Sequence, residues 1–314
     1  MTDQEKLITL GNTDIQISSI GIGAWSWGDR FYWGYGRGYN QDDIKEAFDS
    51  SLASGINFFD TAETYGRGVS ETLLGGLVDL SGNKVVIATK FMPYPWRLNK
   101  SSLLKALRKS LRRLGLNQVD LYQIHWPFPP VSIETWASGL ADAVEHGLTK
   151  AVGVSNYNLN QMRRAQATLV KRGVLLASNQ VEYSLINRKV EFNGLLSCCQ
   201  GLGITLLAYS PLAQGLLTGK YTSKTPPPGI RGRRYSRRVL ENIQPLIRLL
   251  QDIGRNHEGK TTAQVAINWL ICKGVVPIPG AKNAKQAIEN AGSLGWKLSN
   301  EEVDRLDQAS RDIN

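Results

Sequence analysis

Short apolar runs alternate with longer amphipathic stretches along most of the chain, and this alternation predicts strands that are each followed by a helix. Within the longer stretches, apolar residues recur three, four or seven positions apart, as Leu103, Leu107, Leu111 and Leu114 do, which predicts helices with one buried face. Eight runs have the length and apolar content of buried strands. They span residues 20–22, 57–59, 85–89, 119–124, 150–154, 175–179, 205–208 and 275–278.

These strand-and-helix units, at roughly 30 residues each, account for about 250 residues, which is the usual size of a (β/α)8 TIM barrel. We therefore predict an α/β chain whose residues 1–314 form a single barrel domain. Residues 7–17 alternate in polarity about a Gly-Asn pair and predict an N-terminal β-hairpin that covers the barrel floor. Extra helices are predicted near residues 243–253 and at the C-terminus.

The alternative architecture is an open, doubly wound sheet, which normally binds a dinucleotide through a G-x-G-x-x-G sequence. The pairs Gly21/Gly23 and Gly34/Gly36 both lack the third glycine at the required offset. The phosphate-binding pattern G-x-x-x-x-G-K-[ST] does not occur either. The sequence therefore favours the barrel.

The composition is that of a folded globular chain, with 42% hydrophobic and 20% charged residues. No run of about 18 apolar residues predicts a membrane span, and the first ten residues do not resemble a secretory signal. Cys198, Cys199 and Cys272 have neither disulfide-framework nor zinc-ligand spacing. We expect a cytoplasmic, reducing location and no metal.

The formal net charge of +10 suits an anionic partner, whether a nucleic acid, a membrane surface or a phosphorylated small molecule. No zinc-finger, helix-turn-helix or RNA-binding sequence pattern accompanies the charge, and the charge alone does not choose among these partners. We expect binding neither to nucleic acid nor to a membrane.

Ionisable residues follow three consecutive predicted strands, where the chemistry of a barrel is found. Asp60, Lys90 and His125 each end a strand, and their separations of 30 and 35 residues each match one strand-and-helix unit. Tyr65 lies five residues beyond Asp60. A single polar residue at a strand end is commonly structural, but four in register predict one catalytic cluster.

This combination of residues indicates carbonyl reduction. A tyrosine has a pKa near 10, and the adjacent ammonium of Lys90 would lower it. Asp60 would keep Lys90 protonated, His125 would donate a hydrogen bond to the carbonyl oxygen, and Tyr65 would supply the proton to the developing alkoxide. A hydride must come from a cofactor, because no side chain provides one.

The segment Asp60-Thr61-Ala62-Glu63-Thr64-Tyr65-Gly66 resembles the first signature of the aldo-keto reductases. Lys90 and His125 also fall where that family keeps its other catalytic residues. The resemblance continues in the family's order over nearly the whole chain, through Gly153-Val154-Ser155-Asn156, Gln180, Ala208-Tyr209-Ser210-Pro211-Leu212 and Ile278-Pro279-Gly280-Ala281. It is greatest with the cyanobacterial and plant-plastid branch that includes pyridoxal reductases.

The resemblance implies that NADP(H) binds in an extended form across the barrel mouth. Ser155, Asn156 and Gln180 would hold the nicotinamide carboxamide, and Tyr209 would stack on the ring. The full set of cofactor positions implied in this way is Ala24, Trp25, Asp60, Ser155, Asn156, Gln180, Tyr209, Ser210, Pro211, Leu212, Gln214, Gly215, Lys220, Tyr235, Arg237, Gly280, Lys282, Gln286, Glu289 and Asn290.

Residues 230–238 contain five arginines, and the resemblance implies that this segment closes over the cofactor. Arg237 would select NADP by contacting its 2′-phosphate. Many relatives have serine where Lys282 stands, and a lysine there would favour the same phosphate. A solvated basic loop is the alternative interpretation of the segment.

Aromatic residues near the same ends of the strands predict a pocket for flat or apolar carbonyl compounds. They are Trp25, Trp27, Tyr94, Trp96 and Trp126, with Phe128 nearby. Aromatic or aliphatic aldehydes and pyridoxal are all candidate substrates.

The alternative function is a regulatory protein that senses redox state through its cofactor, resembling the potassium-channel β-subunits. Those proteins have Asn at the position of His125, so His125 favours turnover here. A monomer is expected because monomers are common in the family, and an oligomer stays open.

Overall fold

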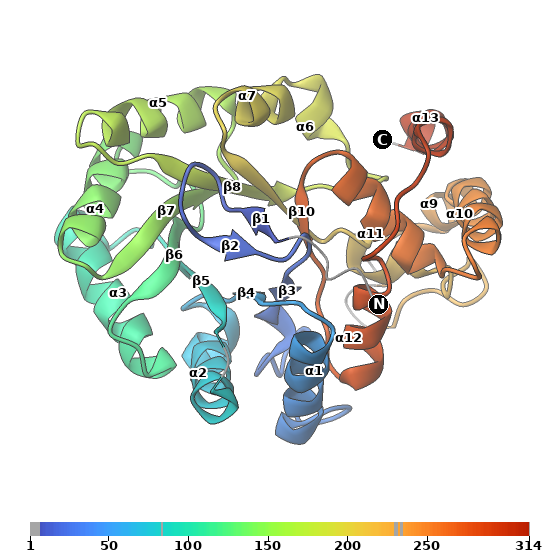
Figure 1. The fold of residues 1–314 in the computed structure, drawn as a ribbon, viewed down its shortest axis with the longest axis horizontal. Coiled ribbons are helices and arrows are strands. Elements are labelled where there is room, and N and C mark those ends of the chain that lie inside the picture. Colours follow the sequence, from blue (N-terminus) through green and yellow to red (C-terminus); the bar gives the residue numbers. More distant parts are fainter. Residues whose placement is uncertain (1–6, 83, 229–231, 233–234, 314) are drawn as a thin grey trace.

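Eight parallel strands form a ring at the centre of the computed structural model, which describes residues 7–82, 84–228, 232 and 235–313 (Figure 1). Each strand pairs with the next in chain order. The ring closes where the N–H groups of Gly21 and Gly23 donate to the carbonyls of Pro277 and Pro279, both at 2.9 Å. The strands are β3 (Ile22–Gly23), β4 (Phe58–Asp60), β5 (Val86–Phe91), β6 (Val119–Ile124), β7 (Thr149–Ser155), β8 (Leu176–Glu182), β9 (Thr205–Tyr209) and β10 (Val276–Ile278). The predicted barrel is confirmed, and each strand overlaps its predicted apolar run.

Helices cover the outside of the ring (Figure 1). In α3 (Lys100–Leu114) the four leucines at helical spacing are buried, Asn99 caps the first turn, and Gly115 ends the helix at a φ of 69°. The other helices with bounds among the described residues are α1 (Gln41–Ala53), α2 (Val69–Ser81), α4 (Ile133–Glu145), α5 (Leu159–Val170), α6 (Lys189–Phe192), α7 (Leu195–Gly201), α9 (Arg237–Asn242), α10 (Gln244–Asn256), α11 (Thr262–Cys272), α12 (Ala284–Ala291) and α13 (Asn300–Ser310). Short 3-10 segments are η1 (Ala24–Ser26), η2 (Tyr65–Gly68), η3 (Ala213–Thr218) and η4 (Arg311–Ile313), of which η2 and η3 are kinked.

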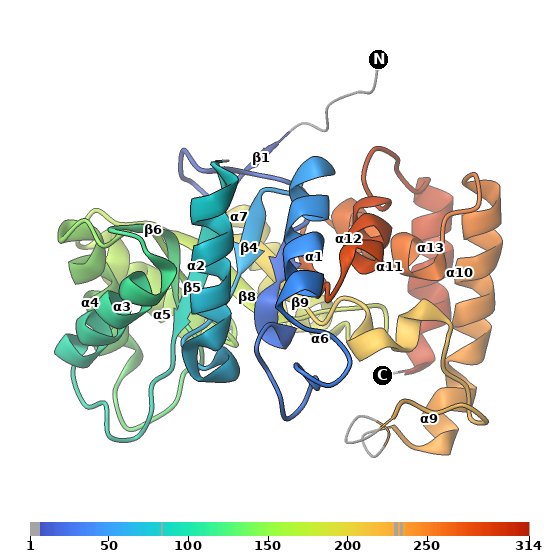
Figure 2. The ribbon, with the colours of Figure 1, turned by 90° about the horizontal axis from the view of Figure 1, so that it is seen from below.

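The predicted additions to the barrel are present. Strands β1 (Ile8–Thr9) and β2 (Gln16–Ile17) pair antiparallel as the N-terminal hairpin. Figure 2 shows this hairpin at one end of the barrel and the long loop between η1 and α1 at the other. The extra helices are α10 and α13, which pack against each other.

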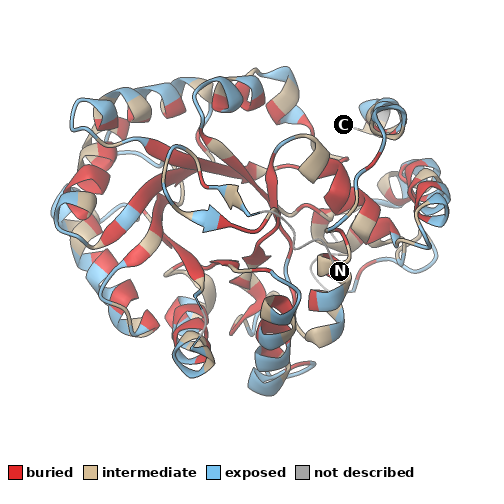
Figure 3. Cartoon of the chain, in the orientation of Figure 1, coloured by how far each residue is buried: buried red, intermediate tan, exposed pale blue. Residues whose placement is uncertain are grey.

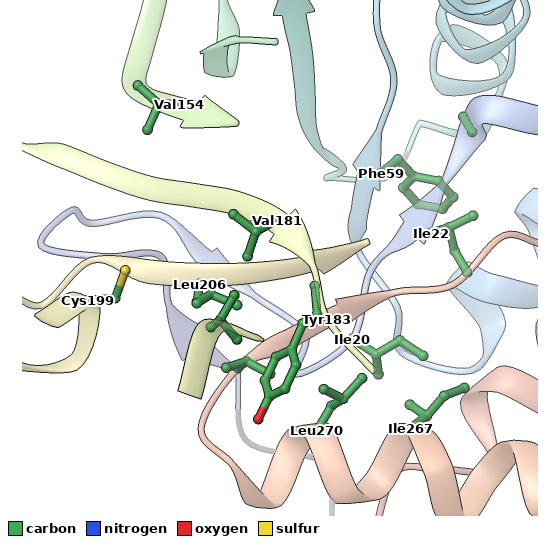
Figure 4. Close-up of a cluster of buried hydrophobic side chains, with 14 of the residues drawn as sticks. Ile20, Ile22, Phe59, Val154, Val181, Tyr183, Cys199, Leu206, Ile267 and Leu270 are labelled. Carbon is green, nitrogen blue, oxygen red and sulfur yellow. The ribbon is translucent and has the colours of Figure 1, made fainter. Parts of the chain in front are cut away.

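Two apolar layers hold the fold together. The inner layer fills the barrel, and Leu10 and Ile17 of the hairpin segment pack in it beside Phe58. The outer layer lies between strands and helices, so that the strands and the inward helix faces are buried and the outward faces are exposed (Figure 3). Figure 4 shows a part of it in which Ile267 and Leu270 of α11 point toward the barrel.

One close approach between helices depends on a glycine. A Cβ on Gly75 of α2 would lie 2.5 Å from the carbonyl oxygen of Leu114 at the end of α3. A Cβ on the next residue, Gly76, would meet nothing within 4 Å. Gly75 therefore sets the spacing between α2 and α3.

Side chains alternate between the two faces of a strand, and this alternation places the polar cluster inside the barrel. Phe58 of β4 and Val86 of β5 belong to the inner layer, and residues two or four positions further along a strand face the same side. Asp60 and Lys90 therefore project into the barrel above the inner layer, and both are buried. Their proximity follows from the pairing of β4 with β5.

Candidate active site

A cavity of about 950 Å³ opens at the carboxyl ends of the strands. Its volume is at the upper end of the range typical of small-molecule and cofactor sites. The predicted site residues that line it are Trp25, Asp60, Tyr65, His125, Trp126, Ser155, Asn156, Gln180, Tyr209, Ser210, Pro211, Leu212, Gln214, Gly215, Lys220, Gly280, Lys282, Gln286, Glu289 and Asn290.

Lys90 lies behind the cavity wall and connects the polar cluster. Its Nζ donates to Asp60 Oδ2 at 2.5 Å, to the Thr61 carbonyl at 2.9 Å and to Tyr65 Oη at 3.1 Å. Burial works against the charged ammonium, but the carboxylate of Asp60 and the hydroxyl of Tyr65 outweigh it, so the pKa of Lys90 is above its ordinary value. Lys90 is therefore a cation at neutral pH.

Asp60 is held by both of its carboxylate oxygens. Oδ2 accepts from Lys90, while Oδ1 accepts from the side-chain amides of Gln180 at 2.8 Å and Gln123 at 3.2 Å. A buried carboxylate needs such partners, because an unpaired charge in this environment would be very costly. Gln123 was not predicted as a site residue, although it lies in β6 two residues before His125.

Tyr65 keeps its proton in this structure. Burial raises the pKa of Tyr65, and the opposing effect of the Lys90 ammonium does not cancel that rise. The Lys90 charge does favour the phenolate, as predicted, but burial acts more strongly in the opposite direction, so the predicted net lowering of the Tyr65 pKa is not found. The phenol is a hydrogen donor held in place by Lys90.

His125 stands beside Tyr65, with the two ring centroids 5.8 Å apart in an edge-to-face arrangement. Burial first and the Lys90 charge second lower the pKa of His125 to about 3, so the imidazole is neutral at physiological pH. Its Nδ1 is buried without a hydrogen-bond partner among the described residues. A neutral imidazole next to a phenol can orient a carbonyl oxygen.

Asn156 joins the ends of three strands. Its φ of 62° is left-handed, its Nδ2 donates to the His125 carbonyl at 3.1 Å, and its Oδ1 accepts from the Tyr209 hydroxyl at 2.9 Å. Ser155 Oγ donates to the Gln180 carbonyl at 2.9 Å. These contacts form a polar wall next to the aromatic face of Tyr209.

The loop after β9 has an unusual backbone. Ser210, Gln214 and Gly215 have φ values of 50°, 56° and 100°, of which the first two are uncommon for residues with side chains. Such a turn brings main-chain groups to the cavity wall, where a phosphate can be bound. Lys220 lines the same region.

Further cations line the cavity beyond β10. Lys282 precedes α12 and Lys285 lies in its first turn, where Asn283 caps the helix. A helix N-terminus with two lysines suits an anionic group. The polar wall near Tyr65, the loop after β9 and this cationic end together provide the features that an extended dinucleotide requires.

Trp27 was predicted in the pocket wall, and the structure places it in the core instead. Its side chain is fully buried, the indole N–H donates to the Ala281 carbonyl at 2.8 Å, and its ring lies 6.2 Å from that of Phe59. Ala24 is also fully buried and does not line the cavity. The 3-10 turn η1 explains the difference, because it directs Trp25 to the cavity while Ala24 and Trp27 are buried in the core.

Tyr94 and Trp96 lie outside the described cavity lining. Their rings stack with centroids 4.7 Å apart, and Trp96 is 73% exposed. Trp126 does line the cavity, and it stacks on Phe128 at 5.5 Å. Of the aromatic residues predicted for the pocket, Trp25 and Trp126 therefore line the cavity, and Tyr94 and Trp96 form a separate stacked pair outside it.

The predicted basic segment 230–238 falls partly outside the described residues, because 230, 231, 233 and 234 are not among them. Tyr235 and Arg237 are described, and neither lines the cavity. Arg237 is 82% exposed and forms an i,i+4 ion pair with Glu241 at 2.8 Å. The Tyr235 hydroxyl donates to the Ala213 carbonyl at 3.3 Å.

Several lining residues were not predicted. Trp33 and Lys285 matter most, because one adds an aromatic surface and the other a cation. The position of Lys285 three residues after Lys282 could have indicated it, whereas Trp33 lies in a loop whose course the sequence pattern does not define. The others are Gly23, Ser26, Thr64, Glu182, Thr218, Ala263, Ile278 and Pro279.

Among the described residues, no helix combines the length and the apolar character needed to cross a bilayer.

Comparison with known proteins gives a consistent result. The family model described as "Aldo/keto reductase family" matches residues 19–311. The chloroplastic pyridoxal reductase of Arabidopsis thaliana is 43% identical over 311 residues, which cover 95% of this chain and 84% of that protein.

Solved structures of similar proteins share the fold. A glycerol dehydrogenase from Gluconobacter oxydans superposes with a TM-score of 0.84 at 26% identity, covering 98% of this chain and 95% of that one. An aldo-keto reductase from Klebsiella pneumoniae, solved in complex with NADPH, has a TM-score of 0.73 at 26% identity, covering 97% and 94%.

Proposed function

Since the chain belongs to the aldo/keto reductase family, we propose that it is an NADPH-dependent reductase of aldehydes or ketones whose proton donor is Tyr65. The observation that carries this proposal is the pair of bonds from Lys90 Nζ to Asp60 and to Tyr65 Oη. They hold a protonated phenol at the wall of a cavity that has cations at its far end.

A dinucleotide bound in this cavity would supply the hydride that a carbonyl reduction requires. Tyr65 donates its proton to the carbonyl oxygen as negative charge develops there, so the products are the alcohol and the oxidised cofactor. Lys90 stabilises the phenolate that remains, and Asp60 keeps Lys90 charged and in place. His125 orients the carbonyl oxygen as a neutral ring.

The lining residues support one orientation of the cofactor. Asn156, Gln180 and the ring of Tyr209 would bind the nicotinamide next to Tyr65, and the left-handed loop after β9 would bind the pyrophosphate. We assign the 2′-phosphate to the cationic end at Lys282 and Lys285, because both lysines line the cavity, whereas Arg237 is exposed and does not line it.

The substrate end of the cavity is bounded by Trp25, Tyr65, His125 and Trp126. Aromatic surfaces next to a hydrogen donor favour an uncharged, flat aldehyde. The likeness to a pyridoxal reductase supports pyridoxal as one member of the substrate panel.

Steady-state oxidation of NADPH, followed against pyridoxal, aromatic aldehydes and aliphatic aldehydes, tests the proposal. We expect turnover with at least one class of aldehyde and stoichiometric formation of its alcohol. Tight binding of NADPH with no turnover of any carbonyl compound would favour a redox-sensing subunit instead. Absence of NADPH binding would refute both.

A further inference from the structure

The loop between η1 and α1 has an ordered conformation on the cavity side of the barrel (Figure 2). The Asp29 carboxylate accepts hydrogen bonds from the N–H groups of Tyr32 at 2.7 Å and Trp33 at 3.0 Å, and the Asp29 carbonyl accepts from the Tyr35 N–H at 2.9 Å. These bonds fix the positions from which Tyr32 and Trp33 leave the backbone. We call Tyr32 and Trp33 together the strap.

The Tyr32 side chain connects this loop to the loop after β9. Its hydroxyl donates to Gln214 Oε1 at 2.7 Å, a contact between residues 182 positions apart. Its ring stacks on the cavity residue Trp25, with centroids 5.2 Å apart and an angle of 15° between the planes. Gln214 lines the cavity in the left-handed turn assigned above to the pyrophosphate.

Trp33 connects the same loop to the segment after β10. Its carbonyl accepts from Lys282 Nζ at 2.9 Å, and the ammonium lies 4.8 Å from the Trp33 ring centre and 4.4 Å from that of Tyr39. Trp33 itself lines the cavity. A cation held by a carbonyl and two aromatic faces is a substantial attachment.

The two attachments reach two different loops of the cavity rim, the one after β9 and the one after β10. In the closed ring, β10 stands between β9 and β3, so a contact from the β3 side to Gln214 passes over the end of β10. Residues after β10, among them Pro279 and Gly280, line the cavity under this crossing.

We propose that the strap is a binding element that retains the dinucleotide, with Tyr32–Gln214 and Trp33–Lys282 as its two attachments. The inference rests on the proposed function, because it concerns the same cavity. It adds Tyr32 and Trp33 to the cofactor-binding residues, and it gives Lys282 a second role that does not depend on the 2′-phosphate.

The test is the rate of dinucleotide release, measured by stopped-flow fluorescence without substrate. Tyr32→Phe removes the hydroxyl but keeps the ring on Trp25, and we expect release of NADPH and NADH to become about 3- to 10-fold faster, as for loss of one hydrogen bond. Tyr35→Phe is the matched control, because Tyr35 lies in the same loop and its hydroxyl has no hydrogen bond among the described residues, while its ring contact with Tyr39 and its backbone bond to Asp29 are kept. Its release rates should equal those of the wild type.

Lys282→Met separates the two roles of that lysine. NADH has no 2′-phosphate, so a lysine that served only that phosphate would leave NADH release unchanged. We expect NADH release to become about 3- to 10-fold faster as the Trp33 attachment is lost, and NADPH release to increase further.

The outcomes separate the inference from the function on which it rests. Equal release from wild type, Tyr32→Phe and Lys282→Met with NADH would overturn the strap while leaving the reductase proposal intact. If the wild type bound neither dinucleotide, the proposed function would fail and the strap with it.

Discussion

Lys90 Nζ lies 3.1 Å from Tyr65 Oη and 4.7 Å from the centre of the same ring, so one buried cation contacts both the oxygen and the face of the phenol. The contact stabilises the phenolate more than the phenol. It is therefore strongest after Tyr65 has given up its proton, which is the direction that favours catalysis.

Replacing Tyr65 tests this relationship directly. Tyr65→Phe keeps the ring and removes the donor, so we expect kcat for aldehyde reduction to fall by a factor of about 10² to 10⁴. The Kd for NADPH, measured by fluorescence titration, should change little. A variant with wild-type kcat would exclude Tyr65 as the proton donor.

The neutral state of His125 predicts a pH dependence of stability. The pKa of His125 is lowered in the folded state to about 3 from an ordinary value of 6.5, so unfolded chains take up a proton between these values that folded chains do not. This contribution to stability is complete above pH 6.5 and is lost progressively as the pH falls toward 3. Between pH 7 and pH 5, the free energy of unfolding of the wild type should fall by about 2 kcal/mol more than that of His125→Asn.

Urea unfolding of both proteins at the two pH values measures this difference. His146 and His257 are present in both proteins, so their contributions cancel in the comparison. Equal losses would mean that His125 is charged or solvated in the folded protein.

Adjacent glycines of α2 give a matched pair for packing. Gly75→Ala places a methyl group 2.5 Å from the Leu114 carbonyl oxygen, and we expect a loss of about 1 to 3 kcal/mol in the free energy of unfolding. Gly76→Ala meets no atom within 4 Å and should stabilise the protein by up to about 1 kcal/mol. Opposite signs in denaturant titrations would support the close approach of α2 to α3, and equal effects would contradict it.

The cationic end of the cavity predicts cofactor preference. Lys285→Met should weaken the binding of NADPH by about 10-fold relative to the binding of NADH, because a charge-assisted contact with the extra phosphate is lost. Arg237→Ala should leave the ratio of the two Kd values unchanged, because Arg237 is exposed and paired with Glu241. Calorimetric titration of both variants decides the matter, and a selective loss in Arg237→Ala would restore the assignment drawn from the family resemblance.

The barrel could be predicted because its signals are local and repeated. Each strand is an apolar run, and each helix shows its buried face in residues such as Leu103 and Leu107. The proximity of Asp60 to Lys90 also followed, because parallel strands place their carboxyl ends together.

Loop residues could not be placed in the same way. Trp25 and Trp27 are two positions apart, yet a 3-10 turn sends one to the cavity and the other to the core. The contact between Tyr32 and Gln214 joins segments that share no sequence pattern, so only the folded chain brings them together. The predicted lowering of the Tyr65 pKa was wrong for a related reason. Burial raises this pKa, and burial is a property of the assembled site that the sequence pattern does not show.

The N-terminal hairpin closes one end of the barrel. Leu10 and Ile17 fill the side of the barrel opposite the cavity, and both are fully buried. Among the described residues, the hairpin leaves the cavity mouth at the carboxyl ends of the strands as the route for a dinucleotide and an aldehyde, and whichever lies deeper would bind first and leave last. If the nicotinamide lies against Asn156 and Tyr209, as proposed, and the carbonyl compound lies between it and the entrance, NADPH should bind first and NADP should leave last, so product inhibition should be competitive between those two alone.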